Sequence, residues 1–530
     1  MKKLTFKYLI PGLILFFLGS CTKNFDEYNT NPNSPGLGQA SPDMLLTQAI
    51  ESMTDRVHEI FLGHEMGSGW VQHMAKVQYT DEDRYIPRIS VINNSWTSFY
   101  AASGYDVFTV IKTADANGQD NYKGVGLVLQ AYITSVLTDL FGNVPYSEAW
   151  KGAVADGGII QPVYDTQESI YPSIIASLEE ANTLLTDAPS VGGDILYGGN
   201  TLSWRRFANS LRLRLLLRMS AKDEPFVEAE MTKMIDDPDT YPIFESSDQH
   251  AALQYLGSAP NNNPINENRK TRDDHRVSKT LVDYIYTFNA FVDWRITLYA
   301  SLDGNDDYEG LPNGLTSSKA AAYNGNGMKY TSKIGSFYTQ ASAPGMLMSY
   351  AELQFILAEA AKKTYIAGGD AAAEAYYLEG IWASYNQNHD YFATELDDTW
   401  GSYFLTQGWD GNQDIVEFAY EHYLANGGHT PDGGSTYYGV GYDPDNALKQ
   451  IAYERWVACF DQGLQSWFEW RRADYPVLIP AEDGQNDGQI PIRVKFPSDE
   501  ASRNSVNLNA AINDMGGEDD LNTPVWWDVD

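Results

Sequence analysis

Apolar side chains recur at intervals of three and four residues along most of this chain, and this spacing limits the fold more than any other feature. The stripe is clearest between residues 203 and 220, where it consists of Trp204, Ala208, Leu211, Leu215 and Met219. Such spacing places the side chains on one face of an α-helix. Similar stripes predict helices over 43–62, 124–141, 168–186, 203–220, 346–361, 370–386 and 447–471.

The predicted helices come in pairs joined by short turns, about every 30 to 45 residues, which is typical of helical-hairpin repeats. Strand-like alternation of apolar and polar residues is scarce. The literal tetratricopeptide signature does not occur, so the repeat is inferred from the pairing alone. We therefore expect a mainly α fold with a scaffold of helix pairs.

Long irregular stretches rich in Gly, Asn, Asp, Pro, Tyr and Trp separate these helices. They cover residues 239–272, 300–345, 388–446 and 472–530. Loops of this length in a compact protein are usually functional or are packed by their own side chains. We expect one body over 42–530, in which these stretches form a second, ligand-binding lobe. Its helical scaffold is expected mainly from 42–238, 275–288, 346–388 and 443–471.

The N-terminus is typical of a bacterial export signal. Three lysines precede an apolar run from Tyr8 to Leu18, which is shorter than the roughly 20 residues that span a bilayer. Leu18-Gly19-Ser20-Cys21 follows and is similar to a lipobox, in which the cysteine is acylated and the chain is cut before it. We expect 1–20 to be a signal peptide, Cys21 the lipidation site, and 21–41 an anchor and tether. The alternative is an ordinary secretory signal with an incidental cysteine.

The charge balance excludes several classes of partner. The chain has 36 Lys and Arg against 71 Asp and Glu, and loss of the three leader lysines would take the net charge from −35 to −38. Nucleic acids and anionic lipid surfaces are bound through clustered basic residues, so neither is an expected ligand. With Cys21 acylated, only Cys459 remains, and no internal disulfide could form. Cys459 lies on an apolar stripe and is expected to be a core residue.

Five arginines on the predicted helix 203–220 raise the alternative of an anion site. Long arginine stems more commonly pack against neighbouring helices while their heads pair with carboxylates. We therefore expect a structural role for these side chains, namely Arg205, Arg206, Arg212, Arg214 and Arg218.

Motifs for enzymatic or metal chemistry are weak. His-Glu-x-x-His and Gly-x-Ser-x-Gly do not occur in the sequence. The acidic turns Asp303–Asp307 and Asp410–Asp414 are not EF-hand loops, although an irregular Ca²⁺ site at either is kept as an alternative to a hydrated turn. No other cofactor is expected. Glu352 and Glu359 lie on one face of one predicted helix, which would not bracket a substrate as the two carboxylates of a glycosidase must. We therefore expect no enzyme.

Several blocks of sequence together resemble a known family. They are Asn29–Pro32, Thr138–Ala149, Trp204–Arg214, Met348–Ala360, Ile451–Trp456 with Gln465–Arg472, and Ile490–Arg493 with Trp526–Asp528. In this order and behind a lipobox, they resemble the SusD/RagB family of outer-membrane lipoproteins, in particular its SusD-like second subfamily. The resemblance covers about residues 21–530.

The resemblance implies a lipid-anchored protein on the surface of a Bacteroidetes outer membrane, with four tetratricopeptide-like helix pairs as scaffold. It implies a SusC-like TonB-dependent transporter as partner, to which captured oligosaccharides are delivered. Capture of peptides is the first alternative, since some members bind them. A helical glycoside hydrolase and an adhesin-like surface protein are further alternatives.

Aromatic residues next to glycines or loops are the candidate ligand contacts. Sugars offer flat C–H faces and many hydroxyls, so they need aromatic platforms together with polar side chains. Trp96 and Tyr100 also lie, by the resemblance, in the region where family members place a binding aromatic. The candidates are Trp96, Tyr100, Tyr323, Trp400, Trp409, Tyr437 and Tyr438.

Overall fold

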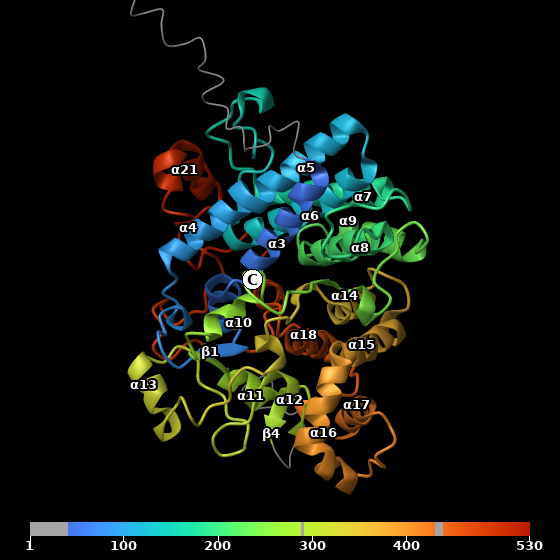
Figure 1. Ribbon diagram of the computed structural model, residues 1–530, viewed down its shortest axis with the longest axis vertical. Helices are drawn as coiled ribbons and strands as arrows, with labels where there is room; N and C mark the ends of the chain where they lie inside the picture. Colours follow the sequence, from blue (N-terminus) through green and yellow to red (C-terminus); the bar gives the residue numbers. More distant parts are fainter. Residues whose placement is uncertain (1–40, 288–290, 430–437, 530) are drawn as a thin grey trace, which may run out of the picture.

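Helices form most of the protein, as the apolar spacing predicts. The computed structural model describes residues 41–287, 291–429 and 438–529. Figure 1 shows an elongated molecule with α5 to α9 in its upper half and α11 to α17 in its lower half. The predicted mainly α fold class is confirmed. Cys21 and Tyr437 lie outside the described residues, and the side chain of Tyr438 does too.

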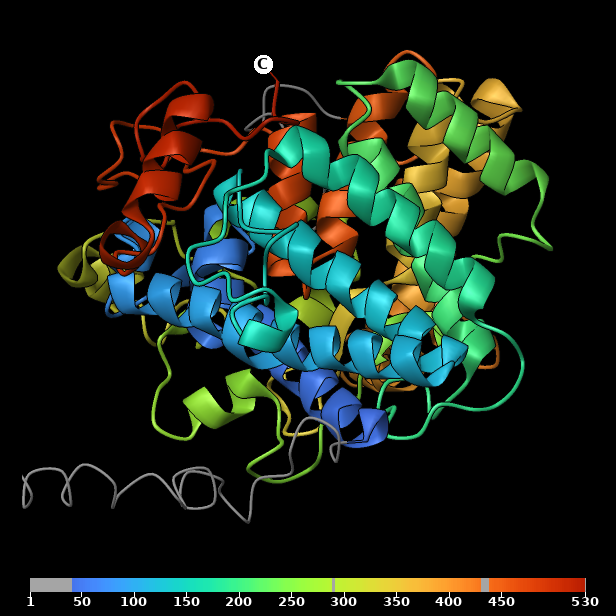
Figure 2. The ribbon, with the colours of Figure 1, turned by 90° about the horizontal axis from the view of Figure 1, so that it is seen from above.

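Consecutive helices that each pack against the next form the upper layer. Figure 2, which looks down on this layer, shows α5, α6 and α7 side by side. The layer contains α3 (Pro42–Val57), α5 (Gly104–Asn117), α6 (Asp120–Phe141), α7 (Gln167–Leu184), α8 (Thr201–Arg218) and α9 (Glu224–Asp236). Four of these helices match predicted stripes, because each buries its apolar face against its neighbours.

A second group of helices lies beneath the upper layer, and its helix α14 contacts α8. It contains α14 (Tyr350–Lys362), α15 (Gly369–Asn386), α18 (Ala447–Ala458) and α19 (Gly463–Ala473). The single helix predicted over 447–471 is wrong, because the chain turns between Cys459 and Gln462. The next helix, α19, begins at Gly463, which lies against the backbone of Gly63. A Cβ on Gly463 would collide with the carbonyl oxygen of Gly63.

The prediction of an irregular stretch over 388–446 is also wrong. Two helices occupy much of it, α16 (His389–Thr406) and α17 (Ile415–Asn426). Phe392, Leu396 and Phe404 are fully buried in α16 and follow a four-residue spacing that the glycines nearby obscured. Gly401 lies inside the helix, where packing overrides its low helix propensity.

Two other predicted helices begin or end differently. The stripe at 346–361 starts with a strand, β6 (Gly345–Met348), before α14. The stripe at 43–62 breaks at His58 and continues as a π-helix, η1 (Ile60–Ser68). A second π-helix, η3 (Ser98–Ser103), joins α4 (Ile89–Thr97) to α5.

Short elements complete the described fold. The strands form four two-stranded antiparallel sheets: β1 (Met74–Lys76) with β3 (His275–Val277), β2 (Ala251–Leu253) with β6, β4 (Tyr286–Thr287) with β5 (Phe291–Val292), and β7 (Gly428–His429) with β8 (Tyr438–Gly439). The remaining α-helices are α10 (Pro264–Arg269), α11 (Lys279–Ile285), α12 (Ile296–Tyr299), α13 (Ser317–Ala322), α20 (Glu500–Arg503) and α21 (Ser505–Asp514). Single 3₁₀ turns are η2 (Glu82–Arg84), η4 (Val154–Asp156), η5 (Ser247–Gln249), η6 (Tyr323–Gly325) and η7 (Phe337–Thr339).

One hydrophobic core extends through both halves, and Trp70, Trp204, Trp294, Trp467 and Trp527 are buried in it. In the described part of the chain, one helix, α6, is long and apolar enough to span a membrane. Its apolar window is 94% buried within the fold, and core helices pass the same test.

Candidate functional site

A buried ionic network joins the two helical layers. Arg214 of α8 contacts Glu352 of α14 through two hydrogen bonds, of 2.8 Å and 2.6 Å. Arg218 of α8 contacts Asp139 at 2.5 Å and Glu469 at 2.6 Å. The expected structural role of the α8 arginines is supported for these two and for Arg212, because all three heads are buried against carboxylates.

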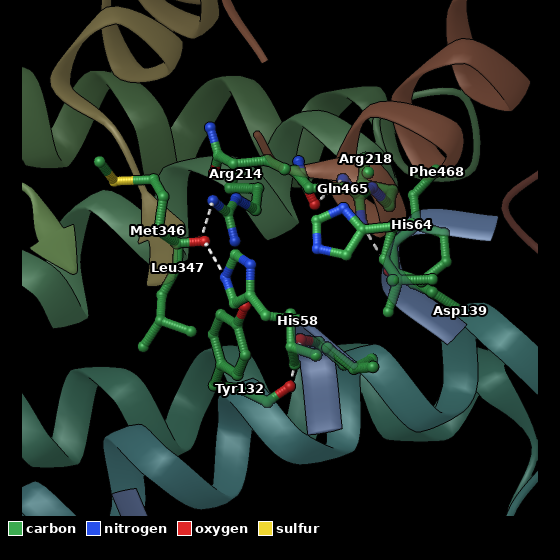
Figure 3. Close-up of a pocket in the computed structure, with 17 residues that line it drawn as sticks. His58, His64, Tyr132, Asp139, Arg214, Arg218, Met346, Leu347, Gln465 and Phe468 are labelled. Carbon is green, nitrogen blue, oxygen red and sulfur yellow. Dashed lines mark hydrogen bonds and ion pairs between the residues drawn. The ribbon is translucent and has the colours of Figure 1, made fainter. Parts of the chain in front are cut away.

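A small cavity lies inside this network. Figure 3 shows His58 and His64 facing Arg214 and Arg218 across it. Its volume is about 20 Å³, which is enough for a water molecule and far too small for a sugar. Burial lowers the pKa of His58 to about 4, so the ring is neutral at neutral pH, and its Nε2 lies 3.0 Å from the Met346 carbonyl oxygen. The cavity is therefore part of the scaffold.

The two glutamates considered for glycosidase chemistry also belong to the scaffold. Glu352 is fully buried and is bonded to Arg214, Arg455 and Gln465. Burial alone would raise the pKa of Glu359, but its ion pairs with Arg472 and Lys363 outweigh burial and lower the pKa to about 2. Glu359 is therefore ionised at neutral pH and has no proton to donate to a leaving group.

A larger hollow opens at the surface beside α11, and we call it the α11 pocket. Its volume is about 380 Å³, which lies within the range of small-ligand sites. Its lining residues come from four segments that are far apart in the sequence. They are Gln72, Lys279, Thr280, Asp283, Tyr284, Pro312, Asn313, Ile479, Pro480 and Glu482.

Hydrogen bonds to side-chain amides hold these segments together. The Gln72 amide oxygen accepts from the Thr280 hydroxyl at 2.6 Å and from the Ile479 backbone N–H at 3.3 Å. The Asn313 amide donates to the Met74 carbonyl at 2.7 Å and to the Asp83 carboxylate at 2.8 Å. Residues separated by about 400 positions are thereby fixed around one opening, and the pocket is preformed.

The rim of the pocket combines an apolar side chain with paired charges. Ile479 is 59% exposed. Lys279 pairs with Asp283 at 2.7 Å, and Glu482 pairs with Lys319 at 2.9 Å. Because each carboxylate has a cationic partner, the opening offers polar contacts without a large excess of either charge.

The predicted ligand contact Tyr323 packs on a cluster that contains Leu311, the residue before Pro312 of the pocket lining. Val77 also belongs to this small apolar cluster, and the Tyr323 hydroxyl donates to Glu309 at 2.9 Å. Burial first, and then the charges of Glu309 and Asp283, raise the pKa of Tyr323. Tyr323 is half-buried and does not itself line the α11 pocket.

Trp96 and Tyr100 are instead packed within an aromatic cluster between α4, η3 and the C-terminal segment. Trp96 is 9% exposed, and its ring lies 4.7 Å from Tyr100, 5.2 Å from Phe141 and 6.5 Å from Phe496. The Tyr100 hydroxyl donates to the Pro145 carbonyl at 2.7 Å. α4 contains Trp96, and η3 contains Tyr100.

Trp400 and Trp409 are anchored to the α16 region. Trp400 lies within α16, and its indole N–H donates to Thr297 at 3.0 Å. Trp409 follows α16, and its indole donates to the Gln413 carbonyl at 2.9 Å. Both rings are half-buried against the core. Neither lines the α11 pocket, so the predicted aromatics do not form one platform.

The two acidic turns are closed by their own backbone. Asp303 accepts from the N–H of Asn305 at 2.7 Å, and Asp410 accepts from the N–H of Asn412 at 2.8 Å. Across the described ranges, no three His, Cys, Asp or Glu side chains are grouped as metal ligands. A Ca²⁺ ion at either turn stays a prediction.

The residues of the α11 pocket carry no signal in the sequence that we could have used. Gln72, Asp283 and Glu482 are ordinary polar residues, and their segments meet only through tertiary contacts, namely the pairing of β1 with β3 and the hydrogen bonds of Gln72 to Thr280 and Ile479.

Comparison with known families identifies the family to which the chain belongs. A family model described as starch-binding and associating with the outer membrane matches residues 32–497. The chain belongs to the SusD-like family. Among curated proteins, no match was found.

Solved structures of SusD-like proteins have the same fold. A chitin-binding protein aligns with a TM-score of 0.75 at 25% identity, over 92% of this chain and 100% of its own. A chitin-binding SusD homologue from Flavobacterium johnsoniae aligns with a TM-score of 0.72 at 22% identity, over 92% and 99%. A SusD homologue from Bacteroides fragilis aligns with a TM-score of 0.69 at 23% identity, over 92% and 99%. The expected resemblance is therefore confirmed across nearly the whole described body.

Proposed function

We propose that this SusD-like protein captures oligosaccharides at the cell surface in the α11 pocket. The observation that carries the proposal is the pocket itself, which is preformed, of ligand size, and lined by amide, hydroxyl and carboxylate groups around an apolar side chain. Such a combination suits sugars, which bury C–H faces and hydroxyls together. The chitin-binding relatives support the same ligand class.

The protein acts as a binding protein without catalysis in this proposal. Glu352 and Glu359, the two carboxylates considered for glycosidase chemistry, are held in buried ion pairs. A glycosidase needs one carboxyl group that is protonated near neutral pH and a second that faces it across the substrate.

Anchoring and delivery complete the proposed function. Acylation of Cys21 would hold the protein at the outer membrane, because a diacyl or triacyl anchor binds firmly where one chain binds marginally. The captured oligosaccharide would pass to a SusC-like TonB-dependent transporter. The family description, which associates these proteins with the outer membrane, supports this location.

Calorimetry with the purified lipoprotein in a detergent without sugar groups tests the proposal. Chitohexaose, cellohexaose and maltoheptaose would be titrated into wild type, Ile479→Asp and the control Val506→Ala, whose side chain is 78% exposed on α21. We expect at least one sugar to bind wild type and Val506→Ala equally, and to bind Ile479→Asp at least about tenfold more weakly, because a charge replaces the apolar contact.

Two results would contradict the proposal. Binding of extended peptides with no binding of any sugar would favour the peptide-capturing alternative. Release of reducing sugar during the titration would show that the protein is an enzyme.

A further inference from the structure

A second surface hollow lies on α5, in the half of the molecule opposite the α11 pocket (Figure 1). Its volume is about 350 Å³, and it shares no lining residue with the α11 pocket. Tyr105, Phe108, Lys112 and Thr113 line it from α5, and Asp156 closes it from η4. We call it the α5 hollow.

Three aromatic rings form a row beside the α5 hollow, in which Tyr105 and Phe108 line the hollow and Trp150 stacks on Phe108. The ring centres of Tyr105 and Phe108 are 6.4 Å apart with 31° between the planes. Those of Phe108 and Trp150 are 6.3 Å apart with 27° between the planes. All three rings are half-buried, so the row keeps accessible surface. Rings on successive turns of one helix do not normally continue onto a residue more than 40 positions away, so the position of Trp150 needs its own cause.

The backbone beside η3 supplies that cause. The Trp150 indole N–H donates to the Tyr100 carbonyl at 2.7 Å, and the Trp150 backbone has a positive φ of 63°. Gly104 leaves room for the indole, since a Cβ there would lie 2.7 Å from its ring. π-Helical turns such as η3 occur frequently at functional sites. Trp150 is therefore held in a strained position that lengthens the aromatic row.

Three polar groups beside the row have no hydrogen-bond partner among the residues that the structure describes. The Tyr105 hydroxyl, the Thr113 hydroxyl and the Asn117 amide make no hydrogen bond to any part of the chain that the structure describes, whereas the neighbouring Thr109 hydroxyl bonds back to its own helix at 2.9 Å. Lys112 and Asp156 pair with each other across the hollow. The hollow thus offers flat apolar faces and unused donors and acceptors with its two charges neutralised.

We propose that the α5 hollow is a second carbohydrate-binding site, which takes neutral pyranose rings and acts independently of the α11 pocket. The rings of Tyr105 and Phe108, which line the hollow, stack on the C–H faces of the sugar. The hydroxyl and amide groups receive the sugar hydroxyls. Anionic sugars bind poorly, because the hollow has no free cation and the chain carries a large negative charge. The inference extends the carbohydrate class of the proposed function to a separate site.

Calorimetry on the full lipoprotein tests the proposal with the same three neutral sugars and with hexagalacturonate as the anionic probe. Phe108→Ala removes the central ring, and Phe108→Leu keeps its apolar bulk but not its flat face. We expect both variants to weaken one class of site at least about tenfold and to leave the other unchanged. Val506→Ala is the control, and the melting temperature checks the fold of each variant. Hexagalacturonate is expected to leave the α5 hollow empty.

A local optical signal identifies the site and guards against a variant that fails to fold. Trp150 stacks on Phe108 of the hollow, so a neutral sugar that binds there should change the Trp150 fluorescence in wild type, and the same change should be missing in Trp150→Phe. The spectrum of Trp150→Phe is subtracted from that of wild type, because the chain has 13 tryptophans that all contribute to the fluorescence.

The outcomes separate this inference from the proposed function. A site lost in Ile479→Asp and a second one lost in Phe108→Leu would support both. Binding that is lost only in Ile479→Asp, with no Trp150 signal, would overturn the inference and leave the proposed function standing. Binding that is lost only in Phe108→Leu would overturn the proposed function and leave the inference standing. Equal binding of hexagalacturonate and the neutral sugars would overturn the proposed selectivity.

Discussion

Arg214 of α8 and Glu352 of α14 form a bidentate ion pair that is buried between the two helical layers. The pair does not stand alone, because Glu352 also contacts Arg455 at 3.4 Å and accepts from Gln465 at 2.8 Å. Four helices, α8, α14, α18 and α19, therefore meet at one carboxylate.

Removal of that carboxylate should destabilise the whole body. Glu352→Ala removes the carboxylate partner of the buried Arg214 and leaves Arg455 with Glu469 alone, and loss of one member of a buried pair costs about 3–5 kcal/mol of unfolding free energy. Urea unfolding followed by circular dichroism measures this. The control Arg503→Ala breaks a pair in which both side chains are exposed, and it should change stability by less than about 0.5 kcal/mol. Equal effects of the two substitutions would contradict the role given to the network.

The contact between η1 and α19 should tolerate no side chain. Gly463→Ala places a methyl group against the Gly63 carbonyl and should cost about 1–3 kcal/mol, because neither backbone can retreat without disturbing the core. Gly257→Ala is the matched control, since nothing lies within 4 Å of its added methyl group. Thermal melts of the two variants compare them directly, and an unchanged melting temperature for Gly463→Ala would refute the contact.

Acid should weaken the protein through Glu359. Its pKa is about 2 in the fold and 4.5 ordinarily, so the folded state favours the ionised form. This stabilisation is fully present above pH 4.5 and is lost as the pH falls towards 2, and it amounts to about 3 kcal/mol. Glu359→Gln should be less stable at pH 7 and should lose less stability over that interval. Unfolding curves at pH 5, 4 and 3 measure the difference, and parallel slopes for the two proteins would contradict it.

Trp96 should prove structural despite its place among the predicted ligand contacts. Trp96→Ala opens a cavity in the aromatic cluster and should lower the unfolding free energy by about 3–5 kcal/mol. Trp96→Phe keeps much of the packing and should leave oligosaccharide affinity within about twofold, since the ring has almost no open face. A tenfold loss of affinity in Trp96→Phe would show that Trp96 contributes to ligand binding.

The thiol count should report lipidation. Cys459 is buried, and burial raises the pKa of its thiol, so a thiol reagent should find none in the native lipoprotein and one per chain in denaturant. A second reactive thiol in denaturant would mean that Cys21 is not acylated. Mutation of Cys21 to Ser supplies the matched reference with one thiol.

The sequence predicted the helical scaffold better than the lobe or the site. Stripes such as Trp204, Ala208 and Leu211 belong to long helices with one buried face, and their spacing is visible without any tertiary knowledge. In α16, Gly401 obscures the same apolar spacing, and packing against the core makes this segment helical. The α11 pocket was beyond prediction, because Gln72 and Ile479 meet through the path of the whole chain.

The buried ion network has a consequence for how this fold can diversify. The sequence blocks that carry the family resemblance contain Arg214, Glu352, Arg455, Glu469 and Arg472, all of which belong to the network. The residues that line the α11 pocket and the α5 hollow lie outside those blocks. The residues that carry the family resemblance and the residues proposed to bind ligands therefore lie in separate parts of the polypeptide. Substitution of one surface side chain at either proposed site leaves the interior charges paired, whereas substitution of one interior charge removes the partner of another buried charge.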